Sequence, residues 1–175
     1  LISGNLVQGI LVEAALDVTI QSNLIGTDVN GTAALGNGGA GIQGGGPGFV
    51  IGGTGAGEGN LVSGNGIGMD LLADGMTVQG NAGGVDDSGI APLPNGGHGI
   101  KLGSPGTAPN IIGAAAPGGP GANHIAYNLG QGIYVGQGAH HTMRGNSIHD
   151  NGLGIDLAGN GPTPNDPLDA DTGIN

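Results

Sequence analysis

The chain repeats itself over a long distance. Residues 18–42, VTIQSNLIGTDVNGTAALGNGGAGI, return 58 positions later as MTVQGNAGGVDDSGIAPLPNGGHGI at residues 76–100. The two copies keep the places of most Asn, Gly and aliphatic residues, whereas the residues between them differ. A fixed period of this length indicates an array of similar supersecondary units. The period matters because Gly and Pro contribute 44 and 10 of the 175 residues, a content that without a repeat suggests low complexity.

Three short phrases recur in a fixed order within the repeat. The first is Gly, aliphatic, any residue, aliphatic, as in GMDL at 68 and GIYV at 132. The second resembles VTIQSN at 18, and the third resembles LVSGN at 61. Each phrase alternates apolar and polar residues, which is typical of a short strand with one buried face. Gly or Asn follows nearly every phrase, and both residues tolerate the backbone of a tight corner.

The spacing of the first phrase defines the repeating coil. Its aliphatic residue returns after 22 to 33 residues, at Ile10, Ile42, Met69, Ile100, Ile133 and Ile155. The shortest interval is a bare coil of three strands, and longer ones carry insertions after the third and second strands alternately. We therefore predict an all-β fold over residues 1–160, a single-stranded right-handed parallel β-helix of about five to six coils stacked roughly 4.8 Å apart. Residues 161–175 form an acidic, Pro- and Asp-rich C-terminal segment, and we expect the chain to be part of a longer protein.

Several strings also carry a family resemblance. NLIGTDVNGTAALGNGGAGI at 23–42, VIGGTGAGEGNLVSGN at 50–65 and NDPLDADTG at 165–173 resemble the right-handed parallel β-helix repeat family of large bacterial secreted and cell-surface proteins, which is related in shape to the pectin lyases. The resemblance extends over essentially the whole chain. It implies the same fold and an extracellular or cell-surface location.

Composition excludes several classes of partner. Lys101 and Arg144 are the only strongly basic residues against 13 Asp and Glu, for a net charge of −11, so the chain cannot neutralise a series of phosphates and nucleic acid is excluded. No cysteine is present, which excludes disulfides and thiolate zinc sites. No apolar run of membrane-spanning length occurs. With only three aromatic residues, the interior must be narrow and aliphatic, and in the bare coil we expect it to include Ile133, Val135, Met143 and Ile148.

Asparagines recur at the corners of the predicted coils. Asparagine at a repeated corner can bond the equivalent amide one coil away and so form a ladder. Alternatively, each asparagine only supplies a left-handed turn. Neither interpretation is catalytic, and both apply to Asn5, Asn23, Asn65, Asn81, Asn128 and Asn146.

Outward positions of the first strand form one column and supply most of the candidate ligand-binding residues. The column contains Leu11, Gln43, Asp70, Lys101, Tyr134 and Asp156. One interpretation is a solvated ladder in which Asp70 and Lys101 pair on adjacent coils. The other is a polysaccharide lying along the column, with Tyr134 as a stacking platform and Lys101 or Asp156 binding hydroxyl groups. Asp70 and Asp156 are three coils apart, about 14 Å, too far for a glycosidase carboxylate pair.

The resemblance to the lyases implies a basic residue that abstracts a proton from an acidic sugar. Arg144 and Lys101 are the available candidates, but Arg144 takes the outward place of Gln21 and Gln79 and has no acidic cluster beside it. The lyase pattern is not met, and Arg144 is kept only as a candidate ligand-binding residue. The histidines at 140, 141 and 149 fall at different corners, with His124 one coil earlier, so we expect separate surface residues rather than a shared metal site.

The C-terminal segment contains a candidate calcium site. Asp166, Asp169 and Asp171 precede the turn-forming Gly173 with an oxygen-rich spacing that suits a hard cation. The alternative is a plain acidic turn. Calcium is therefore a candidate ligand, and no cofactor is required.

Two functions from different classes fit these features. The first is a noncatalytic structural or adhesive module of a secreted or cell-surface protein, favoured because basic and aromatic residues for sugar chemistry are scarce. Polysaccharide or other surface proteins are its candidate partners, and open β-helix ends favour end-to-end self-association. The alternative is a polysaccharide-active enzyme, a lyase, epimerase or glycosidase, with a groove along the first-strand column. That alternative depends mainly on fold analogy, so the sequence favours the noncatalytic module.

Overall fold

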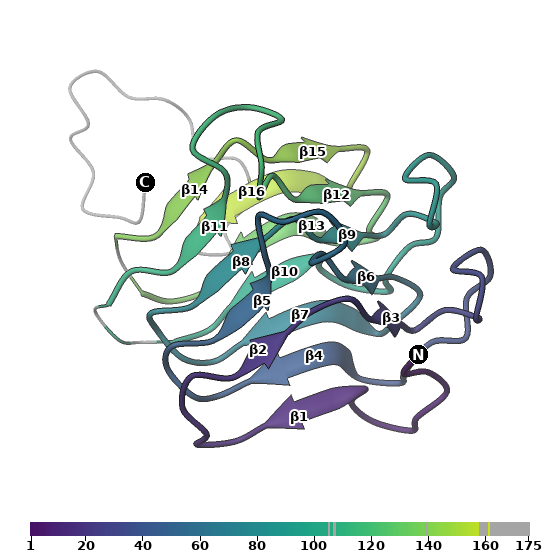
Figure 1. The fold of residues 1–175 in the computed structure, drawn as a ribbon, viewed down its shortest axis with the longest axis horizontal. Coiled ribbons are helices and arrows are strands. Elements are labelled where there is room, and N and C mark those ends of the chain that lie inside the picture. Colours follow the sequence, from purple (N-terminus) through teal and green to yellow (C-terminus); the bar gives the residue numbers. More distant parts are fainter. Residues whose placement is uncertain (105, 107, 139, 158–160, 162–175) are drawn as a thin grey trace.

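The chain winds into a stack of coils. In the computed structural model, described for residues 1–104, 106, 108–138, 140–157 and 161, sixteen short strands and no helix are found. Each strand pairs in parallel with the equivalent strand of the neighbouring coil, and Figure 1 shows the coils rising from β1 at the bottom to β15 at the top. The predicted all-β parallel β-helix is confirmed. Among these residues nothing forms a helix with the length and hydropathy needed to span a membrane.

Three parallel sheets run along the stack, one from each strand of the coil. The first sheet has six strands, β1 (Ile10–Val12), β4 (Ala40–Gly44), β7 (Ile67–Leu71), β10 (Ile100–Leu102), β13 (Gln131–Val135) and β16 (Leu153–Leu157). The second has five, β2 (Thr19–Ile20), β5 (Val50–Gly52), β8 (Thr77–Gln79), β11 (Ile111–Gly113) and β14 (Thr142–Arg144). The third has five, β3 (Leu24–Ile25), β6 (Leu61–Val62), β9 (Ala82–Gly83), β12 (His124–Ala126) and β15 (Ser147–His149).

The core is a thin aliphatic column enclosed by the three sheets. As predicted for the bare coil, Ile133 and Val135 are fully buried, while Met143 and Ile148 are partly buried against the same cluster. Equivalent positions of other coils contribute fully buried side chains that include Ile25, Ile42, Ile51, Leu71, Leu102 and Ile112. The burial of aliphatic groups is thus spread along the stack rather than gathered at one centre.

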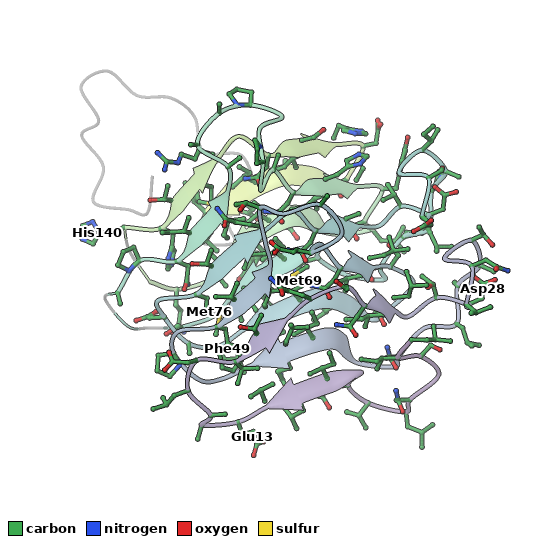
Figure 2. All side chains as sticks on the ribbon, in the orientation of Figure 1. Glu13, Asp28, Phe49, Met69, Met76 and His140 are labelled. Atoms are coloured by element: carbon green, nitrogen blue, oxygen red, sulfur yellow. The ribbon has the colours of Figure 1, made fainter. Side chains whose placement is uncertain are left out.

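The single phenylalanine fills the corner between the first and second sheets. Phe49 is fully buried, and Figure 2 shows it inside the stack with Met69 and Met76, whereas Glu13, Asp28 and His140 project from the periphery. A Cβ atom on Gly44 would lie 2.9 Å from the Phe49 ring. Gly44 therefore replaces the aliphatic residue found at this inward place in other coils because the ring occupies its space.

Asparagines form two continuous ladders along the corners of the stack. In each ladder, the main-chain N–H and Nδ2 of one asparagine donate to Oδ1 of the asparagine in the next coil. The ladder between the third and first sheets consists of Asn5, Asn37, Asn65, Asn95, Asn128 and Asn151. The ladder between the second and third sheets consists of Asn23, Asn60, Asn81, Asn123 and Asn146.

Each interior asparagine bonds to the coil on either side of it. Asn95 is fully buried, and its Nδ2 donates both to Oδ1 of Asn128 at 2.8 Å in the next coil and to the carbonyl of Val62 at 3.0 Å in the preceding one. Its Oδ1 accepts the main-chain N–H of Asn65 at 2.9 Å. The ladder interpretation of the corner asparagines is therefore correct. The left-handed backbone belongs instead to the preceding residue, such as Ser22, Gly64, Gly80, Tyr127 or Asp150.

The ladders also explain the glycine that opens the first phrase. A Cβ atom at this glycine would lie 2.8 to 3.1 Å from Nδ2 of the ladder asparagine in the next coil, for Gly9, Gly41, Gly68, Gly99 and Gly132. Most real Cβ contacts are longer. The side chain is excluded because the amide passes beside the backbone at this place.

Insertions leave the stack at the corners where they were predicted. After the third strand of the first and third coils, residues 27–34 and 85–92 form projecting hairpins closed by antiparallel bridges, visible at the right of Figure 1. Oδ1 of Asp28 and of Asp86 accepts main-chain N–H groups across each hairpin. Hydrogen bonds lower the pKa of both carboxyl groups. The main donors are the main-chain N–H groups of Ala33 and Thr32 at Asp28 and the Ser88 hydroxyl at Asp86. These carboxylates hold their own turns together.

Replacing one interior ladder residue should destabilise the whole stack. Asn95→Ala removes the acceptor of the buried Asn65 main-chain N–H and the side-chain donor to the Val62 carbonyl, so we expect a loss of about 2–4 kcal/mol in the free energy of unfolding. Asn5→Ala, at an exposed end of the same ladder, is the matched control and should cost less than about 1 kcal/mol. Denaturant titration measures both changes. Equal losses would show that an interior ladder amide stabilises the stack no more than the terminal one does.

Two adjacent glycines should respond in opposite directions to alanine. Gly83 borders a core cavity of about 10 Å³, and a Cβ there meets only the Val62 carbonyl at 3.4 Å. Gly83→Ala should therefore stabilise the protein by about 0.4–1 kcal/mol. Gly84 has a φ of +84°, and its Cβ would collide with the Ala126 carbonyl, so Gly84→Ala should destabilise by about 1–3 kcal/mol. Thermal unfolding of the two variants tests the pair. A change of the unfolding temperature in the same direction for both would contradict the backbone conformations assigned to Gly83 and Gly84.

Candidate functional site

The outward column of the first sheet is aligned as the repeat predicts. The strand register pairs Leu11 with Gln43, Gln43 with Asp70 and so on through Lys101, Tyr134 and Asp156. Four of the five predicted ligand-binding residues, Asp70, Lys101, Tyr134 and Asp156, therefore share one face. Asp70 and Asp156 are separated by three strand spacings, about 14 Å, as expected.

The N-terminal half of the column is a chain of side-chain contacts. Nε2 of Gln8 donates to Oε1 of Gln43 at 2.9 Å, and Nε2 of Gln43 donates to Oδ2 of Asp70 at 3.1 Å. Nζ of Lys101 then lies 3.1 Å from Oδ1 of Asp70, an ion pair whose aspartate side chain is only 10% exposed. Successive coils are thus joined by polar side chains outside the sheet as well as by the backbone within it.

The C-terminal half of the column gathers two rings and a second carboxylate. The imidazole of His98 stacks on Tyr134 with ring centroids 4.7 Å apart and planes 16° apart. Nδ1 of His98 accepts the main-chain N–H of Gln131 at 3.3 Å, and Nε2 of Gln131 donates to Oδ2 of Asp156 at 3.0 Å. Four side chains from three coils therefore form one contiguous cluster.

The surroundings of His98 favour its neutral form. Burial lowers the pKa of His98 below its usual 6.5, and the nearby charge of Lys101 lowers it further. The carboxylates of Asp156 and Asp70 act in the opposite direction. A neutral imidazole fits the hydrogen bond that Nδ1 accepts from Gln131.

Asp156 is the most enclosed of the column's charged side chains. The residue is 2% exposed, and while Oδ2 bonds to Gln131, the buried Oδ1 has no hydrogen-bond partner. A buried carboxylate oxygen without a partner is costly and marks a place where a hydroxyl or amide donor would be favourable.

The remaining predicted residues do not join this cluster. Arg144 ends β14 in the second sheet, where it is exposed and aligned with Gly113, so it occupies a different face of the coil. Among the described residues, no carboxylate forms an ion pair with Arg144. The predicted calcium ligands Asp166, Asp169 and Asp171 lie outside the described residues, as does the C-terminal segment apart from Gly161. Where the structure is described, no group of three or more His, Asp or Glu gathers to hold a metal ion.

Sequence reasoning missed His98, Gln131 and Gln8 as members of this face. All three stand directly before the glycine that opens the first phrase, His98 in HGI and the two glutamines in QGI. That place is aligned from coil to coil, since Ala40 pairs with Ile67 and Gln131 with Leu153. The repeat was therefore sufficient to predict a second column beside the first, although it could not predict the stacking of His98 on Tyr134.

Comparisons with known proteins found no relative of this chain. No family model, curated protein or solved structure matches it.

The pKa of His98 should respond in opposite directions to two substitutions. Lys101→Met removes a neighbouring positive charge and should raise the pKa, whereas Asp70→Asn removes a negative charge and should lower it. Because the folded pKa lies below the unfolded value of about 6.5, the unfolded chain binds more protons between these values, and the His98 contribution to stability falls as pH falls through that window. NMR titration of the ring protons measures each pKa. An unchanged value in both variants would contradict the assigned neighbours.

Proposed function

We propose that this protein is a noncatalytic structural or adhesive β-helical module of a secreted or cell-surface protein. One observation carries the proposal, namely that polar side chains on the outward face of the first sheet bond to one another between coils, in one run from Gln8 to Lys101 and in a second contact from Gln131 to Asp156. Side chains engaged in such contacts stiffen the stack and are poorly placed to bind and release a substrate. Contacts of this kind suit a structural role.

Composition and the family resemblance support the same proposal. The net charge of −11 with two basic residues suits a soluble, well-hydrated surface and offers little to anionic sugars. The phrases at 23–42 and 50–65, which resemble the repeat family of bacterial secreted and cell-surface proteins, fold here as hairpin-bearing coils. An extracellular or cell-surface location, with polysaccharide or surface proteins as partners, is part of this proposal. Calcium held by Asp166, Asp169 and Asp171 is an accessory feature of it.

End-to-end association is a further part of the structural proposal. The first coil carries Leu6, Leu11 and Leu16 with 96%, 51% and 68% of their surface exposed. Oδ1 of Asn5, at that end of a ladder, accepts no hydrogen bond from a described residue. A second copy stacked head to tail would cover the leucines and extend the ladder, and a sedimentation coefficient independent of concentration would argue against it.

A polysaccharide-active enzyme is the second candidate because of one specific observation. The buried Oδ1 of Asp156 lacks a partner and lies in the cluster that contains Tyr134 and His98. A sugar hydroxyl could donate to that oxygen while its ring stacks beside the aromatic pair. The cluster has no second carboxylate at glycosidase spacing, since Asp70 is about 14 Å away.

Incubation with polysaccharides separates the two functions. Uronate-containing and neutral polysaccharides should yield neither unsaturated ends nor new reducing sugar, because the structural module has no substrate. Asp156→Ala and Arg144→Ala provide matched variants on different faces of the coil. Turnover by the unaltered protein that Asp156→Ala or Arg144→Ala abolishes would overturn the structural proposal.

A further inference from the structure

Two imidazoles from neighbouring coils meet on the outside of the third sheet. His124 begins β12 and His149 ends β15, two strands that lie side by side near the top of Figure 1. The register aligns His124 with Ser147 and Ala126 with His149, so the two histidines are diagonal neighbours. Their Nε2 atoms are 3.0 Å apart, with ring centroids separated by 5.1 Å and planes tilted by 35°. The sequence-based expectation of separate surface histidines is wrong for this pair.

Neighbouring groups fix the orientation of His149. Its Nδ1 lies 2.9 Å from Oδ2 of Asp150, and the edge-to-face contact with Tyr127 has centroids 5.9 Å apart at 86°. A carboxylate at Nδ1 keeps the proton on that nitrogen, which leaves a lone pair on Nε2 directed at His124. Carboxylate support of the outer nitrogen is also the usual arrangement around histidines that bind metals.

We propose that His124 and His149 form a two-histidine site for a divalent transition-metal ion, with water completing the coordination. Two nitrogen ligands, each about 2.0–2.1 Å from one ion and at roughly 90–110° to one another, are about 2.9–3.4 Å apart. The 3.0 Å separation of the two Nε2 atoms already meets this requirement. The ion takes the place of the single proton between the two Nε2 atoms, and that proton moves to Nδ1 of His124, so that both imidazoles stay neutral.

The chemistry of the pair selects the class of ion. Imidazole nitrogen favours Ni²⁺, Cu²⁺ and Zn²⁺, whereas Ca²⁺ and Mg²⁺ prefer oxygen ligands. Asp150 is engaged with Nδ1 of His149, so the protein supplies two ligands and the site is open to water. Because the ligands belong to adjacent coils, a bound ion would link β12 and β15 outside the sheet. This metal site is independent of the structural role proposed above.

Binding of Ni²⁺ alone to the untagged protein tests the proposal. Isothermal titration calorimetry at neutral pH should give one equivalent bound, with a rise in the unfolding temperature, because the ion binds the folded state. His124→Asn and His149→Asn should each weaken binding by more than about tenfold, and Asp150→Asn by roughly tenfold through loss of the supporting charge. His140→Asn is the matched control, since His140 is an exposed histidine on the periphery of the stack in Figure 2 and asparagine tolerates its φ of 61°.

A second readout keeps the test decisive if a variant folds poorly. In the unaltered protein, substoichiometric Ni²⁺ should broaden the ring-proton signals of His124 and His149 before those of His98, His140 and His141. Ca²⁺ should leave these signals unchanged, even if it binds at the C-terminal aspartates. Broadening centred on other histidines, Ni²⁺ affinity retained in both single variants, or no binding at millimolar Ni²⁺ would overturn the proposal.

Discussion

The fold depends on the hydrogen bonds that asparagine side chains form at the corners of the coils. A strand satisfies its N–H and C=O groups with the neighbouring coils, but at a corner the chain changes direction and these groups lose their strand partners. In both ladders, Oδ1 accepts from the asparagine of the preceding coil, and Nδ2 of an interior member donates to a carbonyl of that coil. The corner is therefore closed by hydrogen bonds within the protein. Left-handed residues such as Gly64 and Gly80 precede the amide to aim it inward, and Gly68 or Gly99 makes room for it.

With the corners closed in this way, a thin core is sufficient. Each coil buries only a few aliphatic side chains, and an alteration such as Gly44 opposite Phe49 is absorbed within one corner. Insertions are tolerated because they leave the stack before the ladder residue, as the hairpin at 85–92 does before Asn95. The outer surfaces are left free to carry polar side chains in register. The contact of Lys101 with Asp70 arises because equivalent residues are stacked one strand spacing apart, and that of His124 with His149 because diagonal positions on neighbouring strands are within side-chain reach.

The repeat was sufficient to predict the strands, the three-sheet stack, the corner insertions and the outward column. It was not sufficient to identify all the ladder members, because Asn37, Asn60, Asn95, Asn123 and Asn151 were missed. Insertions separate Asn37, Asn60, Asn95 and Asn123 from the strand before, so these residues do not close a short phrase as Asn23 and Asn65 do. The histidine pair was also out of reach, since His124 and His149 are diagonal rather than aligned and meet only through their side-chain conformations. Periodicity predicts backbone register well and predicts side-chain direction poorly.

Hydrogen exchange of the asparagine side-chain amides tests the ladders most directly. The Nδ2 groups of Asn81 and Asn95 are buried and donate to three and two acceptors respectively, whereas Asn30 is exposed on the first hairpin. In an NMR exchange experiment, the Asn81 and Asn95 side-chain protons should exchange at least about 100-fold more slowly than those of Asn30, because exchange requires the coils to separate. Exchange of all three side chains at the same rate would contradict the account.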